Sequence, residues 1–319
     1  MTAFTNLVGC RLPLQLAGMT RVAAAPLAAA VTEAGGLGML GLGRTPPAVL
    51  SIMLDELATL TTGPVGGTFI VRYLDRGALE LVAERLGIVE FFYEWPDASL
   101  LPSNAICGWQ CGSVDEARAA VDAGCDYVIA QGIEAGGHVR GSVPLARLLD
   151  ETRAAVRVPL VAAGGIGTRT DVDRALAAGA DAVRIGTRFI AATESQAHPD
   201  YIDSLIAAGS HDSILTDLFD VGWPDAPHRV LASAMVAALQ VGPDPAAEVI
   251  AGDGSVVVVP RRGATPPSNT TTGDIAAMAL YAGRSVGAVT GRSSAADIVT
   301  ELTAGTTRHA GEGTRIVQV

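Results

Sequence analysis

The sequence has few aromatic residues, few charged residues and no excess of basic ones. Aromatic residues make up 4% and charged residues 17% of the 319 residues, while apolar residues make up 49%. The formal net charge of -11 argues against binding to nucleic acid or to an anionic membrane, because both need clustered Lys and Arg. The interior is expected to consist mainly of Ala, Val, Leu and Ile, and the length suffices for one large barrel or two domains.

Cysteine is also scarce, and its spacing fits neither a metal site nor a disulfide framework. The four cysteines are Cys10, Cys107, Cys111 and Cys125. Without a CxxC pair they are expected to be buried, reduced thiols, which indicates the cytoplasm. Glu194 and His198 lie four positions apart but do not form an HExxH motif, so no metal site is expected.

Export signals and membrane-length apolar runs are missing from the sequence as well. No basic segment opens the chain, and the apolar stretch after Val22 is interrupted by Pro26 and Glu33, too early for a membrane span. We therefore expect no membrane association. The net charge is compatible with a monomer or a homodimer.

Eight short apolar runs alternate with amphipathic or Ala-rich segments in the first 190 residues. The runs are Leu14–Ala17, Gly38–Leu42, Val65–Ile70, Val89–Tyr93, Ala105–Trp109, Tyr127–Ala130, Leu160–Ala163 and Ala182–Ile185. Their starts are about 15 to 35 residues apart, as expected of βα units. Val114–Ala123 and Val172–Ala178 have helical periodicity, and each is followed by a glycine that suits a helix C-cap. This order predicts an α/β protein, a (β/α)₈ TIM barrel.

The barrel is expected to occupy residues 1–200, and the sequence changes character after it. Residues 201–260 are broken by Gly222 and Pro224 before a helical Val230–Leu239, which predicts a smaller, mostly helical subdomain. Residues 261–319 are expected to form a C-terminal loop and helices that pack back on the barrel.

The segment QGIEAGGHVRG, from Gln131 to Gly141, resembles an active-site loop. It follows the predicted strand Tyr127–Ala130 and places His138 behind Gly136 and Gly137, which allow the backbone to approach a ligand closely. A lone loop histidine is often only hydrogen-bonded to the backbone. However, a parallel barrel carries its active site at the C-terminal ends of its strands, and this position favours a functional His138.

Two more strand ends are followed by glycine-rich loops. Ala162–Gly167 follows the seventh predicted strand and Ile185–Thr187 follows the eighth. These are the loops where (β/α)₈ barrels commonly bind a phosphate through backbone amides. The alternative is a pair of tight strand-to-helix turns.

These segments resemble the FMN-dependent nitronate monooxygenases, formerly called 2-nitropropane dioxygenases. The motifs that carry the resemblance are LQLAGM (Leu14–Met19), EAGGLGMLG (Glu33–Gly41), QGIEAGGHVRG, VAAGGIG (Val161–Gly167), ADAVRIGTRF (Ala180–Phe189) and MALYAGRSVG (Met278–Gly287). Each motif is loose by itself, but their order and spacing together are specific. The resemblance implies an FMN-binding TIM barrel with an added segment and with FMN across the strand ends.

The resemblance also implies roles for individual residues, with His138 as the catalytic histidine. The implied FMN contacts are Ala17, Gly18 and Met19 at the flavin ring, Gln131, Gly136 and Gly137 beside it, and Gly164, Gly165, Gly186 and Thr187 at the phosphate, with Arg184 and Ile185 leading into that cradle. Where the family usually has Asn after the third strand, this chain has Thr68, which keeps one hydroxyl for a hydrogen bond.

Four further residues are weaker candidates. Arg140 stands in an extra position after His138 and either reaches toward an anionic substrate or is a solvated loop side chain. Tyr93, Trp95 and Trp109 end predicted strands or follow them, and they either wall the pocket or serve simple packing.

The function implied is the FMN-dependent oxidation of alkyl nitronates or nitroalkanes by O₂ to carbonyl compounds and nitrite. Three alternatives remain open from the sequence. One is an NAD(P)H-dependent flavin reductase acting on a quinone or an enoyl thioester, because related flavin barrels have similar EAGGH and AAGGI motifs. The others are a flavin-binding barrel without turnover and a phosphosugar enzyme without flavin, since fold alone does not settle function.

Overall fold

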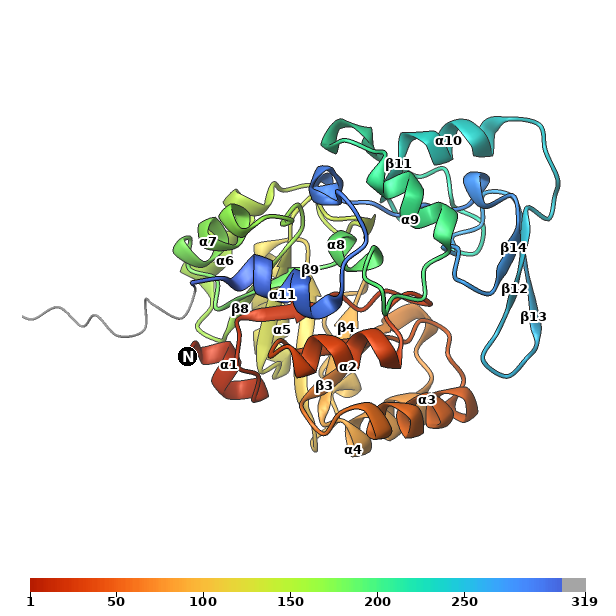
Figure 1. The fold of residues 1–319 in the computed structure, drawn as a ribbon. Coiled ribbons are helices and arrows are strands. Elements are labelled where there is room, and N and C mark those ends of the chain that lie inside the picture. The colour runs from red at the N-terminus through yellow and green to blue at the C-terminus, as the bar shows by residue number, and fades with distance from the viewer. Residues whose placement is uncertain (306–319) are drawn as a thin grey trace, which may run out of the picture.

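The computed structural model describes residues 1–305, so the last part of the C-terminal segment expected over 261–319 lies outside the described residues. The predicted barrel is confirmed (Figure 1). Its strands are β1 (Leu14–Leu16), β2 (Gly38–Gly41), β3 (Val65–Ile70), β4 (Ile88–Phe92), β5 (Ile106–Cys111), β6 (Tyr127–Gln131), β8 (Leu160–Ala163) and β9 (Ala182–Ile185). Each coincides with one of the eight apolar runs to within two residues at either end.

All neighbouring barrel strands are parallel, in the order β1-β9-β8-β6-β5-β4-β3-β2. The ring closes where Leu37, just before β2, lies beside β1: Leu37 donates its backbone N–H to Leu14 at 2.9 Å, and Leu16 donates to Leu37 at 2.9 Å. Closure gives all the strands one common C-terminal face. The loops singled out in the sequence therefore meet there.

The surrounding helices begin and end where the sequence chemistry indicates. They are α2 (Ala25–Glu33), α3 (Pro47–Leu60), α4 (Arg76–Arg85), α5 (Val114–Ala123), α6 (Leu145–Ala155), α7 (Arg169–Ala177) and α8 (Thr187–Ile190). Helix α5 has the predicted bounds, with a Ser113 N-cap and a left-handed Gly124 at its C-terminus. Helix α7 begins three residues before the predicted Val172, because Thr168 and Asp171 form a capping box.

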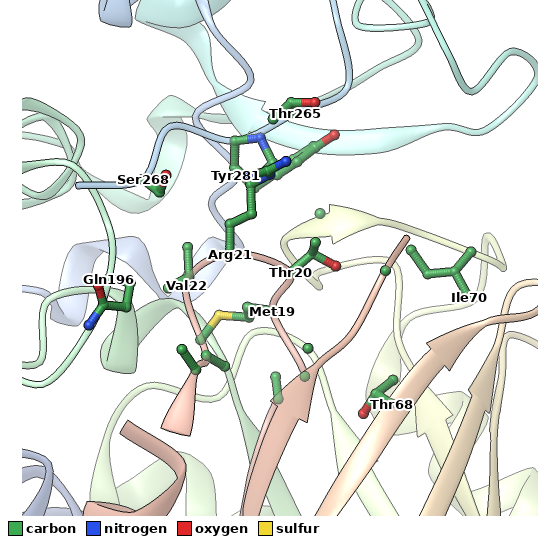
Figure 2. Close-up of a pocket in the computed structure, with 18 of the residues that line it drawn as sticks. Met19, Thr20, Arg21, Val22, Thr68, Ile70, Gln196, Thr265, Ser268 and Tyr281 are labelled. Atoms are coloured by element: carbon green, nitrogen blue, oxygen red, sulfur yellow. The ribbon is translucent and has the colours of Figure 1, made fainter. Parts of the chain in front are cut away.

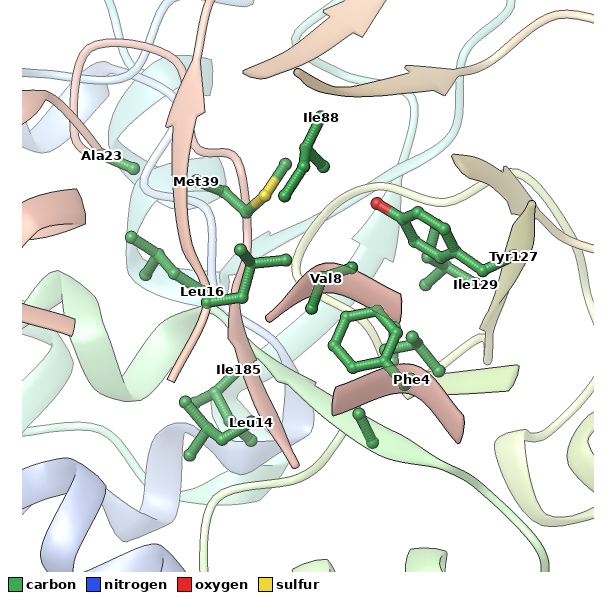
Figure 3. Close-up of a cluster of buried hydrophobic side chains, with 14 of the residues drawn as sticks. Phe4, Val8, Leu14, Leu16, Ala23, Met39, Ile88, Tyr127, Ile129 and Ile185 are labelled. Carbon is green, nitrogen blue, oxygen red and sulfur yellow. The ribbon is translucent and has the colours of Figure 1, made fainter. Parts of the chain in front are cut away.

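Aliphatic and aromatic side chains pack where the barrel strands begin, and helix α1 (Ala3–Val8) contributes to this part of the core. Phe4 and Val8 of α1 belong to the same buried cluster as Tyr127 and Ile129 of β6 (Figure 3). The Phe4 ring meets Tyr127 of β6 edge to face, with centroids 5.4 Å apart. Because α1 packs at the beginning of the strands, it leaves their C-terminal ends to the ligand site.

The segment after the barrel contains more strand than the sequence indicated. It comprises α9 (Pro199–Ile206), β10 (Ser213–Thr216), β11 (His228–Leu231), α10 (Ala232–Leu239), β12 (Ala247–Ile250), β13 (Val256–Val259) and β14 (Thr271–Gly273), followed by α11 (Ala295–Thr303). We refer to residues 199–291 as the added segment. It lies beside the barrel in Figure 1, while α11 returns to pack against α2, α7 and α8.

The expectation of a mostly helical subdomain over 201–260 is thus wrong, and the helix expected from Val230 begins at Ala232. Val230 and Leu231 belong to β11, which lies between β10 and the two-residue strand β7 (Gly137–His138). A short apolar run is compatible with either a buried strand or a helix, so periodicity could not separate them. None of the helices in residues 1–305 is long and apolar enough to cross a membrane.

Candidate active site

A cavity of about 950 Å³ lies between the C-terminal ends of the barrel strands and the added segment (Figure 2). It brings together nearly all the residues that the sequence singled out. Those that line it are Ala17, Gly18, Met19, Thr68, Gln131, Gly136, Gly137, His138, Gly164, Gly165, Arg184, Gly186 and Thr187. They come from the ends of five different barrel strands, as expected for a (β/α)₈ active site.

Ile185 is the exception, because it does not line the cavity. Its side chain is fully buried in the barrel core beside Leu14 (Figure 3). Side chains alternate between the two faces of a strand, so Arg184 and Ile185 cannot both face the strand-end cavity.

The glycine-rich loops after β8 and β9 carry unpaired backbone donors. Gly164 and Gly165 have φ of 111° and 70°, which favours glycine and turns the backbone toward the cavity. Within residues 1–305, the backbone N–H groups of Gly164, Gly165 and Gly186 have no hydrogen-bond acceptor. Because unpaired backbone donors are costly unless water or a ligand satisfies them, this cluster suits an anionic oxygen group.

Gly136 has a structural constraint as well as a place in the cavity wall. An added Cβ would lie 2.4 Å from the backbone nitrogen of Gly283, so the two backbones must touch. The same Gly283 nitrogen donates to Thr187 Oγ1 at 3.0 Å. The MALYAGRSVG motif therefore joins the β6 and β9 loops, which explains why it belongs to the same sequence pattern.

Gln131 at the end of β6 holds the loop that carries His138. Its Nε2 donates to the carbonyl oxygen of His138 at 2.9 Å, and its Oε1 accepts from the backbone nitrogen of Arg140 at 3.0 Å. Both ends of the amide are thus engaged by the loop. This arrangement fixes the backbone of His138 relative to the barrel.

Below the cavity, the barrel contains a buried ion pair that the sequence analysis missed. Arg184 pairs with Glu90, which is fully buried in β4. Glu90 Oε1 also accepts from Gln15 Nε2 at 2.6 Å and from the Tyr127 hydroxyl at 2.7 Å. The signal was available, because a carboxylate inside the apolar run IVEFF must have partners when it is buried.

Thr68 also belongs to this network. Its hydroxyl donates to Glu90 Oε2 at 3.0 Å, while the residue lines the cavity. A Cβ on Gly18 would lie 2.3 Å from Thr68 Oγ1, so the β1 loop packs directly on this side chain. Thr68 therefore links the floor of the cavity to the buried ion pair.

His138 lies in β7, which pairs antiparallel with β11 of the added segment. Its ring stacks on Trp223, with centroids 3.7 Å apart, and is close to Tyr281. Within the described chain, Nε2 is buried and has no hydrogen-bond partner. Burial, with a smaller contribution from His228, holds the pKa of His138 well below its usual range, so the ring is neutral near pH 7.

The weaker candidates lie outside the cavity wall. Arg140 forms an ion pair with Glu116, Nε to Oε1 2.7 Å, and its guanidinium lies 5.4 Å from the Tyr93 ring centroid. It is therefore neither a solvated side chain nor a cavity-lining one. Trp109 is fully buried and stacked on Phe91, whereas Trp95 is exposed.

The aromatic wall consists instead of residues that the sequence analysis did not select. They are Tyr73, Phe92, Tyr201, Trp223 and Tyr281. Tyr93 lies behind this wall, with its ring centroid 4.8 Å from that of Trp223. Trp223 and Tyr281 belong to the added segment, and no local pattern places them beside His138.

A model of the nitronate monooxygenase family matches residues 97–305. The chain belongs to the nitronate monooxygenase family. Its members are oxidoreductases that use a flavin, and the unpaired amides of the β8 and β9 loops fit the anionic part of such a cofactor.

The relatives of this nitronate monooxygenase family member are named for different activities. The chain is 32% identical to a (3aS,4S,5R,7aS)-5-hydroxy-7a-methyl-1-oxo-octahydro-1H-indene-4-carboxyl-CoA dehydrogenase from Rhodococcus jostii, over 75% of this chain and 68% of the relative. A mutant FabK from Thermotoga maritima has a TM-score of 0.77 and 30% identity, covering 95% of this chain and 94% of the other. Nitroalkane oxidase from Streptomyces ansochromogenes has a TM-score of 0.73 and 28% identity, covering 97% and 99%.

Proposed function

We propose that this protein binds FMN and oxidises alkyl nitronates, or nitroalkanes after deprotonation, with O₂ as the acceptor and with carbonyl compounds and nitrite as products. The observation that carries the proposal is the unpartnered Nε2 of His138 in the same cavity as the unpaired amides of the β8 and β9 loops. Buried polar groups without partners are uncommon in folded proteins and cost about 1–3 kcal/mol each. Their coincidence in one cavity supports a ligand that engages both.

In this proposal the phosphate of FMN accepts hydrogen bonds from Gly164, Gly165 and Gly186. Ala17, Gly18 and Met19, which line the same cavity, would hold the flavin ring. Gly136 and Gly137 leave room beside the ring. When bound, FMN supplies the electron-accepting centre for the reaction, a chemistry that no side chain provides.

In this proposal His138 accepts the proton that a nitroalkane loses, or hydrogen-bonds the nitro group. A neutral imidazole accepts the α-proton of a nitroalkane at Nε2, or donates a hydrogen bond to the nitro group in its other tautomer. Gln131 and the β7–β11 pairing hold the backbone of this residue in place. Trp223 and Tyr281 exclude water from the ring. A preformed nitronate requires no base, so it depends less on His138.

A second candidate function is a flavin-dependent dehydrogenase or reductase that uses NAD(P)H or NAD(P)⁺. The size of the cavity favours it, because about 950 Å³ is at the upper end of the range for small-ligand sites. The similarity to the Rhodococcus jostii dehydrogenase, whose name contains a carboxyl-CoA group, also supports a larger substrate.

The visible spectrum of the purified protein under anaerobic conditions tests the proposal. Bleaching or a semiquinone after addition of an alkyl nitronate, with no change from NADH or NADPH, is the expected result. Bleaching by a pyridine nucleotide and indifference to nitronate would replace the first function with the second. Release of FMN on denaturation, identified by chromatography, checks the cofactor separately.

The proposal also includes a cytoplasmic location. All four cysteines are free and buried, which is compatible with the cytoplasm. Light scattering on the purified protein distinguishes a monomer from a homodimer.

A further inference from the structure

Arg21 lies in the turn between β1 and α2, and its side chain extends into the cavity. Figure 2 shows it rising from the loop toward Tyr281, on the side of the cavity formed by the added segment. Among residues 1–305 its guanidinium has no hydrogen-bond partner, ion pair or ring contact. Arg21 is partly buried, and burial lowers its pKa from the usual value.

The other two arginines of the cavity are committed to protein contacts. Arg184 is paired with Glu90. Arg44 lies over the Tyr73 ring, 3.8 Å from its centroid, and donates to the Gly222 carbonyl at 3.2 Å. Arg21 is therefore the cavity-lining arginine whose five donors are free in the described part of the chain.

The backbone of Arg21 is strained as well. Val22 and Ala23 both donate to the Met19 carbonyl, at 3.0 and 2.8 Å, which closes a tight turn. Arg21 is the third residue of this turn and has φ of 65°, in the left-handed region where glycine is favoured. A side chain that costs stability at such a position points to a functional constraint.

We propose that Arg21 is a specificity-determining residue that binds an anionic oxygen group, a carboxylate or phosphate, on the substrate at a distance from the carbon that is oxidised. The direction of the side chain supports this assignment. In Figure 2 Arg21 extends toward Tyr281, whose ring centroid is 5.6 Å from that of His138. A planar guanidinium binds either anion through two parallel hydrogen bonds.

The rest of the cavity indicates that such a substrate has an apolar body. Val49 and Met53 of α3 line the cavity, together with Ile250, Val257 and Val258 of the β12–β13 hairpin. The carboxylates on the wall are Glu56 and Asp253, and neither pairs with Arg21 in the described residues. The inference rests on the proposed function only in assuming that the substrate enters this cavity.

The test is a binding measurement that needs no turnover. Titration calorimetry on the flavin-saturated protein compares hexanoate, hexyl phosphate and 1-hexanol, which share one apolar chain. We expect the wild type to prefer an anion, and the preferred anion identifies the group. In Arg21→Gln the ratio of the 1-hexanol Kd to the anion Kd should fall at least tenfold, whereas Arg21→Lys should retain part of the preference.

Two further variants separate the loss of the Arg21 charge from an effect on folding and from a general effect of removing an arginine. Arg21→Gly removes the charge in a residue that tolerates the positive φ, so it should unfold at a temperature no lower than the wild type and should still lose the preference. Arg262→Gln is the matched control, because Arg262 also has a positive φ, 62°, but lies outside the cavity wall. It should keep the full preference.

A wild-type Kd ratio in Arg21→Gln and Arg21→Gly would overturn the assignment, as would a wild type that binds 1-hexanol as well as both anions. Loss of flavin from Arg21→Gln with an unchanged anion preference would also overturn it, because Arg21 would then hold the cofactor. Failure of the protein to oxidise nitronates would instead contradict the proposed function and leave the Arg21 result standing.

Discussion

His138 and His228 lie opposite each other in two paired strands, β7 and β11, yet their hydrogen bonding differs completely. His228 Nε2 accepts from the backbone nitrogen of Phe219 at 3.2 Å, and Nδ1 lies 2.9 Å from the carbonyl oxygen of Ala226. Since Nε2 accepts, Nδ1 carries the proton and donates. His138 has no partner at Nε2.

The two buried rings differ in role: His228 stabilises the fold through its ring nitrogens, whereas the ring of His138 is left free for a ligand. Burial lowers the pKa of both, so both are neutral near pH 7. His228 uses both nitrogens to hold the turn before β11. His138 is positioned through its backbone and through the face of its ring, on Trp223, which leaves its nitrogens available for a ligand.

The largest expected effect is on catalysis, from His138→Asn. If Nε2 accepts the α-proton, nitroalkane turnover should fall by about 10²–10⁴-fold, the usual contribution of a positioned base. Steady-state rates with a nitroalkane and with its preformed nitronate measure this directly. The nitronate rate should fall much less, and equal losses on both substrates would contradict the base role.

A substitution of His228, in the paired strand β11, should mainly change the free energy of unfolding. His228→Leu leaves the Phe219 N–H and the Ala226 carbonyl without partners, which should lower the free energy of unfolding by about 2–4 kcal/mol. Urea unfolding measures the change. His138→Asn loses no ring hydrogen bond and serves as the comparison; if it were the more destabilising of the two variants, the distinction between the histidines would be wrong.

The smallest expected effect is the pH dependence of stability. Both histidines have a lower pKa in the folded protein than the ordinary value of 6.5, so below that pH the unfolded chain binds more protons than the folded one. Stability is therefore fully present above about pH 6.5 and decreases on acidification, by at most about 1.4 kcal/mol per pH unit for each histidine.

Urea unfolding at a series of pH values between 5 and 8 checks this dependence. His138→Asn and His228→Leu should each flatten the acid side of the profile by removing one titrating group. An unfolding free energy that rose as the pH fell below 6.5 would mean that the two rings are protonated in the folded protein.

Much of the barrel could be predicted from the sequence because its signals are local. Strands such as Leu160–Ala163 are short apolar runs, and α5 is delimited by Ser113 and Gly124, which act on their immediate neighbours. Strand β11 was mistaken for the start of a helix because its partners, β10 and β7, come from distant parts of the sequence. Local periodicity carries no information about such partners.

The candidate site also contains residues that the sequence could locate and residues that it could not. Residues at strand ends, such as Gly164 and His138, could be located because a parallel barrel brings all its C-terminal strand ends together. Ile185 directly follows Arg184 in β9, so its side chain lies on the opposite face of the strand and is buried away from the cavity. Glu90 was overlooked although its burial inside an apolar run was visible.

The sequence by itself determined the barrel, its strand ends and the glycine-rich loops, because these depend on apolar periodicity, on helix caps and on the backbone freedom of glycine. Only the tertiary structure decided which rings surround His138, which arginine of the cavity is left free and which face of β9 is buried. Trp223 and Tyr281 reach His138 by chain folding over many residues, and the availability of Arg21 depends on where every carboxylate lies. Such relations arise from packing between distant segments, which a linear sequence does not encode in any local pattern.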